Sequence, residues 1–419
     1  MLFSLSLLLL LSASYFFGRL SAGPPRFAVE QQSAVLDSAW KNFQRAQQQA
    51  MDLMRADDFY DDEISRAEAY RGLLYNLAGS IKSALVDPDN PRFVRAVDWS
   101  SKSGLENPDN SYYTARVSGA SVYRIRGNRG SVASMVFQVV EGQPGVGDAG
   151  TSTHVSMLYG EQLQCDGEGN FEIYVASEPP PAGGNWLRLN ERAGMILLRF
   201  SHSDWQSERA GWAYIEPLDV PAARPPLSES AMAEQLDLAA RSLYDRTATW
   251  LHYAKKLSLL PANTLSAVRP SQGGLVGQYS AFGRWQLAED ELLLISVPPS
   301  AAPYQGIQLG NNWFVSLDYE SHTASLTADQ AYLSSDGLYH FVVSLSDPGV
   351  QNWLDPESHR SGLILMRWQG LPEPLAQQPR AEKLSWRQLR ERLPADVFGF
   401  DAEARASQLA ARREQVQRR

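Results

Sequence analysis

A five-residue pattern that combines two carboxylates with a histidine occurs twice in the C-terminal half of the chain. Asp-x-Glu-Ser-His runs from Asp318 to His322 and again from Asp355 to His359. On an extended backbone alternate side chains share a face, so the acids and the histidine of each copy would point the same way. Such groups can act as general acid and base, or hold a divalent metal. Asp318, His322, Asp355 and His359 are therefore the candidate catalytic residues, and the identity of any metal stays open.

The alternative is that both patterns are loops. Aspartates in loops cap turns by accepting hydrogen bonds from nearby backbone N–H groups, and histidines there bond locally. Pro356 favours a turn at the second site. In that case the four residues would have a structural role only.

A second candidate site combines arginines with tyrosines in the N-terminal half. Arg124 and Arg126 alternate with apolar residues, which indicates that both point away from an apolar face, and Arg129 follows in a glycine-bounded turn. Guanidinium groups bind carboxylate, sulfate or phosphate, and Tyr112 and Tyr113 could stack on a sugar ring. These five are the candidate ligand-binding residues. The alternative is an exposed sheet face with weak surface ion pairs, beside tyrosines that belong to a core.

Composition excludes several function classes. The 419 residues include 47 acidic and 38 basic side chains, with a formal charge of −9, and a nucleic-acid binder would need a basic footprint instead. Cys165 is the single cysteine, which excludes an intrachain disulfide or a cysteine-based metal site. The sequence contains no P-loop, dinucleotide fingerprint or zinc-protease motif, so we expect no cofactor.

The elements that must position these residues are duplicated. Each copy consists of an Asp-Gly turn, a strand, an Asn-Trp-Leu segment and a strand that ends in arginine, and the copies span residues 166–199 and 336–367. Such a repeated order predicts two related β-domains in tandem. Trp186 and Trp353 occupy the same place in both copies, which favours packing in a core over stacking on a ligand.

This signature resembles that of a bacterial family known only as paired domains of unknown function, of the 1254/1214 type, which occur in exported proteins. Residues 107–113 and 123–130 resemble the entry segment of those relatives, and the likeness spans most of residues 65–370. The resemblance implies two β-sandwich-like domains with helical additions. It implies no activity.

We therefore expect a mainly β protein with α additions: two tandem related antiparallel β-sandwich (jelly-roll-like) domains, an N-terminal helical hairpin and a connecting helix. The expected segments are a helical hairpin at 28–90, the first sandwich at 95–220, the connecting helix at 227–262, the second sandwich at 272–372 and a charged helical tail at 380–419. The arginines of the tail should form a solvated face.

The second helix of the hairpin has an apolar stripe that includes Tyr70, Leu74, Ile81 and Leu85. We expect this stripe to be buried against a sheet, and the alternative is an arm that binds a partner. At the N-terminus, residues 2–17 form an apolar run, so 1–23 is expected to be a signal peptide or a single membrane anchor.

The protein is therefore expected in the periplasm, free or membrane-anchored. The function expected is a non-catalytic binding module of the cell envelope that holds a small or glycan-like ligand at the interdomain cleft. The alternative is a hydrolase or lyase centred on Asp318, His322, Asp355 and His359. No nucleic acid is expected as a partner, and the oligomeric state stays open.

Overall fold

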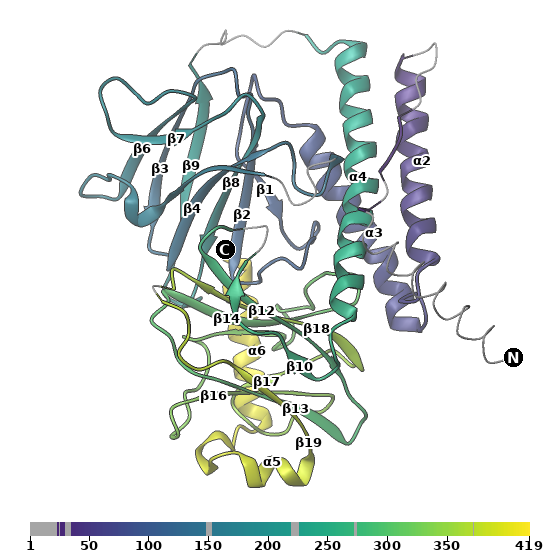
Figure 1. Ribbon diagram of the computed structural model, residues 1–419, viewed down its shortest axis with the longest axis vertical. Helices are drawn as coiled ribbons and strands as arrows, with labels where there is room; N and C mark the ends of the chain where they lie inside the picture. Colours follow the sequence, from purple (N-terminus) through teal and green to yellow (C-terminus); the bar gives the residue numbers. More distant parts are fainter. Residues whose placement is uncertain are drawn as a thin grey trace, which may run out of the picture.

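The computed structural model describes residues 23–24, 26–29, 35–147, 153–218, 226–271, 275–371 and 373–419. Two β-sandwiches are stacked one on the other, and three long helices run beside the first sandwich as far as its junction with the second (Figure 1). Residues 1–22, which carry the expected signal peptide or anchor, lie outside the described residues. None of the helices in the described part of the chain is both long and apolar enough to cross a membrane.

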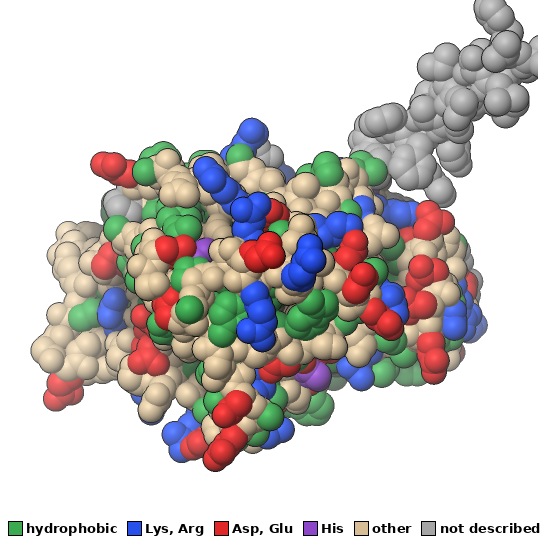
Figure 2. Space-filling view, turned by 90° about the horizontal axis from the view of Figure 1, so that it is seen from below, with side chains coloured by type: hydrophobic (Ala, Val, Ile, Leu, Met, Phe, Trp, Pro, Cys, Tyr) green, Lys and Arg blue, Asp and Glu red, His purple; other side chains and the backbone are tan. Residues whose placement is uncertain are grey.

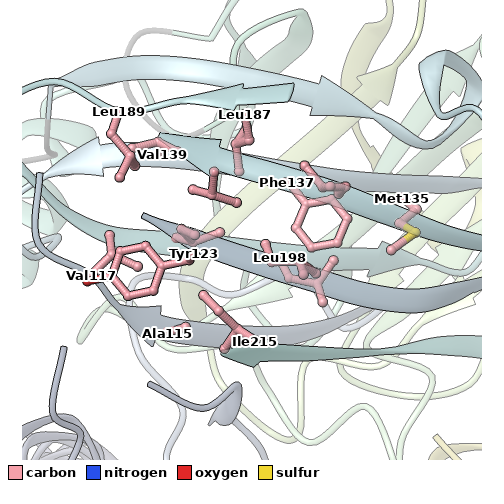
Figure 3. Packing of buried hydrophobic residues seen from close by; sticks show 14 of the residues in the cluster. Ala115, Val117, Tyr123, Met135, Phe137, Val139, Leu187, Leu189, Leu198 and Ile215 are labelled. Atoms are coloured by element: carbon pink, nitrogen blue, oxygen red, sulfur yellow. The ribbon is translucent and has the colours of Figure 1, made fainter. Parts of the chain in front are cut away.

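The first sandwich pairs a five-stranded sheet, in the order β1-β2-β8-β4-β5, with a four-stranded sheet, in the order β7-β6-β3-β9. Alternate side chains of both sheets, among them Ile125, Phe137, Ile173 and Leu198, point inward and form a core without exposed surface (Figure 3). The strands are β1 (Val94–Val97), β2 (Asn110–Arg116), β3 (Tyr123–Gly130), β4 (Ser134–Glu141), β5 (His154–Tyr159), β6 (Asn170–Ala176), β7 (Asn185–Arg188), β8 (Ala193–Ser201) and β9 (Ala210–Pro217).

The second sandwich repeats this topology strand for strand. Its larger sheet has the order β10-β12-β18-β14-β15, with β11 also paired to β12, and its smaller sheet has the order β17-β16-β13-β19. The strands are β10 (Thr264–Leu265), β11 (Arg269–Pro270), β12 (Gln278–Gln286), β13 (Glu291–Val297), β14 (Tyr304–Gly310), β15 (Ser325–Thr327), β16 (Tyr339–Ser344), β17 (Trp353–Leu354), β18 (Ser361–Gln369) and β19 (Arg380–Ser385). The prediction of two related antiparallel sandwiches with helical additions is confirmed.

The Asn-Trp-Leu segments form the same element in both sandwiches, a short edge strand that runs parallel to its neighbour. Leu187 and Leu354 enter the two cores. Both tryptophan side chains point away from the sandwich interior. Trp353 nevertheless belongs to a core, because it is buried in the apolar cluster under α5 and Arg405 of the C-terminal helix lies over its ring at 5.2 Å. Trp186 is only half-buried, so the expectation of a core position is wrong for Trp186.

Helices α2 (Val35–Arg55), α3 (Glu63–Ala84) and α4 (Glu229–Ser258) form the layer beside the sandwiches, and both α2 and α3 pack on α4. The buried face of α3 consists of small and polar residues, including Gly72, Asn76 and Gly79. The apolar stripe is exposed instead, from 41% at Ile81 to 63% at Leu74, so the expected burial of this stripe is wrong. The face with small residues is buried because small side chains let α4 pack closely against α3.

After the second sandwich, α5 (Trp386–Arg392), a short 3-10 turn (Ala395–Val397) and α6 (Ala402–Gln417) complete the described chain. Apolar residues of α5 cover the outer face of the β17-β16-β13-β19 sheet. Arg405 and Arg412 of α6 are buried and donate hydrogen bonds to Asp347 and to the Tyr319 carbonyl, so the expectation of a solvated face is wrong for these two. Arg413 and Arg418 are exposed, as expected. Seen from the end that carries α5, acidic and basic side chains are interspersed over the surface (Figure 2).

Candidate functional site

The two Asp-x-Glu-Ser-His segments lie side by side, and both are turns. His322 Nδ1 is 2.7 Å from Asp355 Oδ2, and the backbone N–H of Asp318 donates to the Glu357 carboxylate. Glu357 and Ser358 have φ angles of 51° and 65°, in the left-handed region. The segment is therefore not extended, and the premise that alternate side chains share a face fails there.

His359 joins the second sandwich to helix α3. Its Nδ1 donates to the Pro356 carbonyl at 2.7 Å, and its Nε2 lies 3.1 Å from Glu68 Oε1. Burial opposes protonation of the ring, but the ion pair with Glu68 outweighs burial and raises the pKa of His359 to about 9. At neutral pH the imidazole is therefore charged and acts as a tie between α3 and this turn.

The remaining contacts also fit the loop alternative. Asp318 accepts hydrogen bonds from the backbone N–H groups of Glu320 and Ser321, and these outweigh burial, so that the pKa of Asp318 is lowered. Burial opposes protonation of His322, but its bond to Asp355 raises the pKa. Asp318 lines a polar cavity of about 570 Å³, which His322, Asp355 and His359 do not line. Within the described ranges, no group of three or more histidine, cysteine or acidic side chains could hold a metal ion.

Of the candidate arginines, Arg124 and Arg126 lie on the outer face of the β7-β6-β3-β9 sheet. Arg124 Nε donates to Glu216 Oε1 at 2.8 Å, and Arg126 Nη2 lies 3.2 Å from the same oxygen. In the second sandwich the strand register places Leu294 where Arg124 stands in the first, and Leu294 lies under α5. The two arginines thus lie on a sheet face that α5 covers in the second sandwich but that is open to solvent in the first. Ion pairs on such an exposed face contribute little to stability.

The structure does not bring the five candidate ligand-binding residues together. Tyr112 and Tyr113 lie on β2 of the other sheet and, as neighbours in a strand, they point to opposite faces. Tyr113 packs edge-on against Phe200 in the core, with ring centroids 6.1 Å apart. Arg129 lies at the end of β3. Of the five, only the two tyrosines border the cavity between the sandwiches, and the Tyr112 side chain lies on the sheet face that lines this cavity.

A cavity of about 310 Å³ lies between the two sandwiches. Its walls are the outer faces of β2, β4 and β8 on one side and of β12 and β18 on the other, and helices α3 and α4 border it. Each sandwich contributes an arginine from the same place in its sheet: Arg199 on β8 and Arg367 on β18. These are the last residues of the duplicated signature, so the duplication places a matched pair of cations on facing walls.

Each of these arginines is paired with a glutamine on the adjacent strand. Arg199 Nη1 donates to Gln138 Oε1 at 2.6 Å, and Arg367 Nη1 donates to Gln308 Oε1. The two glutamines also occupy equivalent positions, opposite Leu197 on β8 and Leu365 on β18 respectively. The polar pair is therefore as much a part of the repeat as the core.

The surroundings of the two arginines differ. Arg367 Nη2 also donates to the Leu105 carbonyl at 2.7 Å. Burial raises the pKa of Asp109, and the positive charge of Arg367 partly opposes that rise. Burial lowers the pKa of Arg199, the nearby Tyr112 and Tyr159 oppose this in part, and the positive charge of Arg367 lowers the pKa further. Part of the Arg199 surface faces the cavity although protein surrounds the guanidinium.

Helix α4 presents Arg246, Trp250 and Tyr253 to the cavity from one face, at spacings of four and three residues. Arg246 passes between two glycines, because a Cβ at Gly79 would lie 3.3 Å from its Nη1 and a Cβ at Gly145 would lie 3.2 Å from its Cγ. Its Nε is buried and has no hydrogen-bond partner among the described residues. Burial lowers the pKa of Arg246 to about 10, so the guanidinium stays charged at neutral pH.

The same face of α4 gives the cavity an aromatic wall. Trp250 and Tyr253 stack on Phe314, with ring centroids 5.8 and 6.2 Å apart. The backbone beneath is held in an unusual conformation, since Leu105 and Phe314 have φ angles of 48° and 63° and the Leu105 N–H donates to the Phe314 carbonyl. Strained residues of this kind often border functional sites.

The sequence carries a signal for these residues that lies outside any motif. Arg199 and Arg367 each follow a run of apolar residues, and a cation at that place in a buried strand is unusual. Arg246 stands in line with Leu243 and Trp250 on the apolar stripe of its helix. A charged residue in such a stripe indicates either a buried partner or a ligand.

Comparisons with known proteins give a likeness in fold. An uncharacterized protein from Burkholderia cenocepacia has a solved structure with a TM-score of 0.78 to this chain, is 28% identical, and is matched over 84% of this chain and 99% of its own. A protein from Vibrio parahaemolyticus is 11% identical over 75% of this chain and 99% of its own, with a TM-score of 0.44.

No protein-family model and no curated protein matches the chain. The resemblance to the paired domains of unknown function therefore stays a prediction.

Proposed function

We propose that the protein binds a small organic molecule in the cavity between its two sandwiches. One observation carries the proposal: a cavity of about 310 Å³ with apolar and aromatic walls receives a few convergent polar groups from both sandwiches and from α4. Small-molecule sites in proteins have this composition and occupy roughly 300–1,000 Å³, often between domains. The apolar run at residues 2–17 supports the further proposal that the ligand is met in the cell envelope.

Contacts around the cavity support a site that is formed before the ligand arrives. Gln308 Nε2 donates to the Glu106 carbonyl at 2.9 Å, and Ser201 Oγ donates to Gln369 Oε1 at 2.8 Å. Both bonds join the first sandwich, or the segment that leads into it, to the second. A preformed cavity favours affinity, because little conformational freedom is lost on binding.

The lining favours binding over hydrolysis. Among the described residues that line the cavity there is no histidine, aspartate or cysteine, and Glu106 is the single acid. A hydrolytic reaction would need a positioned base of that kind. The larger cavity beside Asp318 is a weaker candidate, because its lining is mainly polar, whereas small-molecule sites are mostly apolar.

A fluorescent apolar probe tests this proposal. N-phenyl-1-naphthylamine should gain fluorescence with the wild-type protein, and Leu197→Trp, which fills the cavity from β8, should weaken its binding at least tenfold. Leu333→Trp makes the same change at a position 44% exposed on the second sandwich and should bind like wild type. Equal binding by all three proteins, or none by the wild type, would overturn the proposed function.

A further inference from the structure

The charges that line the interdomain cavity are unbalanced. Lysine and arginine side chains contribute four positive groups, Lys82, Arg199, Arg246 and Arg367, against the single acid Glu106. Lys82 is neutralised by Asp98 at 2.5 Å. Glu106 is fully engaged elsewhere, since it accepts hydrogen bonds from the backbone N–H and hydroxyl of Ser316. The arginines therefore lack a matching negative charge in the cavity.

Arg246 is the least compensated of these groups. A glutamine accepts from each of Arg199 and Arg367, whereas the buried Nε of Arg246 has no partner among the described residues. Burial is the one cause that shifts the pKa of Arg246 within the part of the chain that the structure describes. Leaving a buried charge unpaired is costly, so natural proteins pair such groups or use them to bind a ligand. The nearby Trp250 Nε1 is a second buried donor without a partner in the described chain.

Two glycines provide the space that the Arg246 side chain occupies. Gly79 of α3 and Gly145 of the loop after β4 leave room for this side chain. A Cβ at Gly79 would lie 3.3 Å from Arg246 Nη1, and a Cβ at Gly145 would lie 3.2 Å from Arg246 Cγ. A guanidinium held by packing alone is oriented in advance toward whatever it binds, because its position does not depend on a polar partner.

We propose that the cavity takes an organic anion, whose charged group is held by Arg246 and whose apolar part lies against the aromatic wall of Trp250, Tyr253 and Phe314. The inference rests on the proposed function and names its ligand class. A carboxylate suits the site, because it accepts two parallel hydrogen bonds from one guanidinium. Arg199, which also lacks an acidic partner, adds to the positive potential that attracts the anion.

Decanoate and 1-decanol form a matched pair of probes, since they share an apolar chain and differ in charge. Each is titrated against the complex of the full chain with N-phenyl-1-naphthylamine, whose displacement reports occupancy of the cavity. Decanoate should displace the probe at a concentration at least tenfold lower than 1-decanol. Arg246→Gln should abolish that preference, whereas Arg126→Gln, which removes an exposed arginine on the opposite sheet, should keep it.

The outcomes separate the two claims. If decanoate and 1-decanol displace the probe equally well, or if Arg246→Gln keeps the preference, the anion class is wrong while the cavity remains a binding site. If neither compound displaces a bound probe, the ligand class is also overturned. If the probe itself does not bind to the wild type, the proposed function fails, and the ligand class fails with it.

Discussion

Replacing Arg246 by methionine should stabilise the ligand-free protein. Burial lowers the pKa of Arg246 from 12.5 to about 10, and at about 1.4 kcal/mol per pH unit this corresponds to about 3 kcal/mol that the folded protein loses by keeping the group charged. Methionine keeps most of the side-chain volume without the charge. Imperfect packing of the new side chain offsets part of the gain, so we expect a net stabilisation of about 1–2 kcal/mol.

Thermal unfolding measures this change. One kcal/mol moves the midpoint by about 2–4 °C for a unit of 150–250 residues, so the transition that includes α4 should rise by about 2–8 °C. Arg126→Met is the matched control, because Arg126 is an exposed arginine in a surface ion pair. Its free energy of unfolding should change by less than about 0.5 kcal/mol.

Ligand should narrow the difference in stability. At about one hundred times its wild-type dissociation constant, decanoate would add about 2.7 kcal/mol to the wild-type protein, but about 1.4 kcal/mol to an Arg246→Met protein that binds it about tenfold more weakly. The stabilisation of the variant relative to the wild type should therefore shrink by about 1.3 kcal/mol. A ligand-free Arg246→Met protein that is less stable than wild type by more than about 1 kcal/mol would refute the reasoning, because Arg246 would then have a stabilising partner in the folded state.

Two further predictions concern the ties around the site. His359 has a folded pKa of about 9, above its unfolded value of about 6.5, so the stability from its pair with Glu68 is complete below pH 6.5 and is lost as the pH rises through 9. His359→Gln should therefore lower the unfolding midpoint at pH 6.5 by several degrees and hardly at pH 10, and an equal loss at both would exclude this account. Gly79→Val should push Arg246 aside and weaken decanoate binding tenfold or more, whereas Gly72→Ala, whose Cβ would lie 3.6 Å from Met54 Cε, should bind normally and gain up to about 1 kcal/mol from helix propensity. Unchanged binding by Gly79→Val would show that the position of Arg246 does not matter.

The fold was predictable because its signals are local. An Asp-Gly turn, a strand with alternating apolar residues and the Asn-Trp-Leu segment recur in the same order, and equal order along the chain gave equal topology in space. The apolar stripe of α3 misled for the opposite reason. Periodicity predicts which residues share a face but not which face is buried. Gly72 and Gly79 lie on the buried face of α3, because small residues let another helix pack closely.

The cavity was not predictable from motifs, because it forms only where two sheets from separate halves of the chain meet. Arg199 and Arg367 lie 168 positions apart along the printed sequence and belong to different sandwiches. The repeated Asp-x-Glu-Ser-His pattern has the residue types of a catalytic site, yet turns at both places direct its side chains to local partners and to Glu68. An uncompensated charge in an apolar stripe, such as Arg246, was the more informative sign.

The structure of a decanoate complex tests the central claim most directly. A crystal structure of the full chain soaked with decanoate should place the carboxylate within hydrogen-bond distance of the Arg246 guanidinium, with the chain against Trp250 and Phe314. Decanoate bound elsewhere, for example on the exposed face that carries Arg124, or a cavity that stays free of it at saturating concentration, would contradict the account.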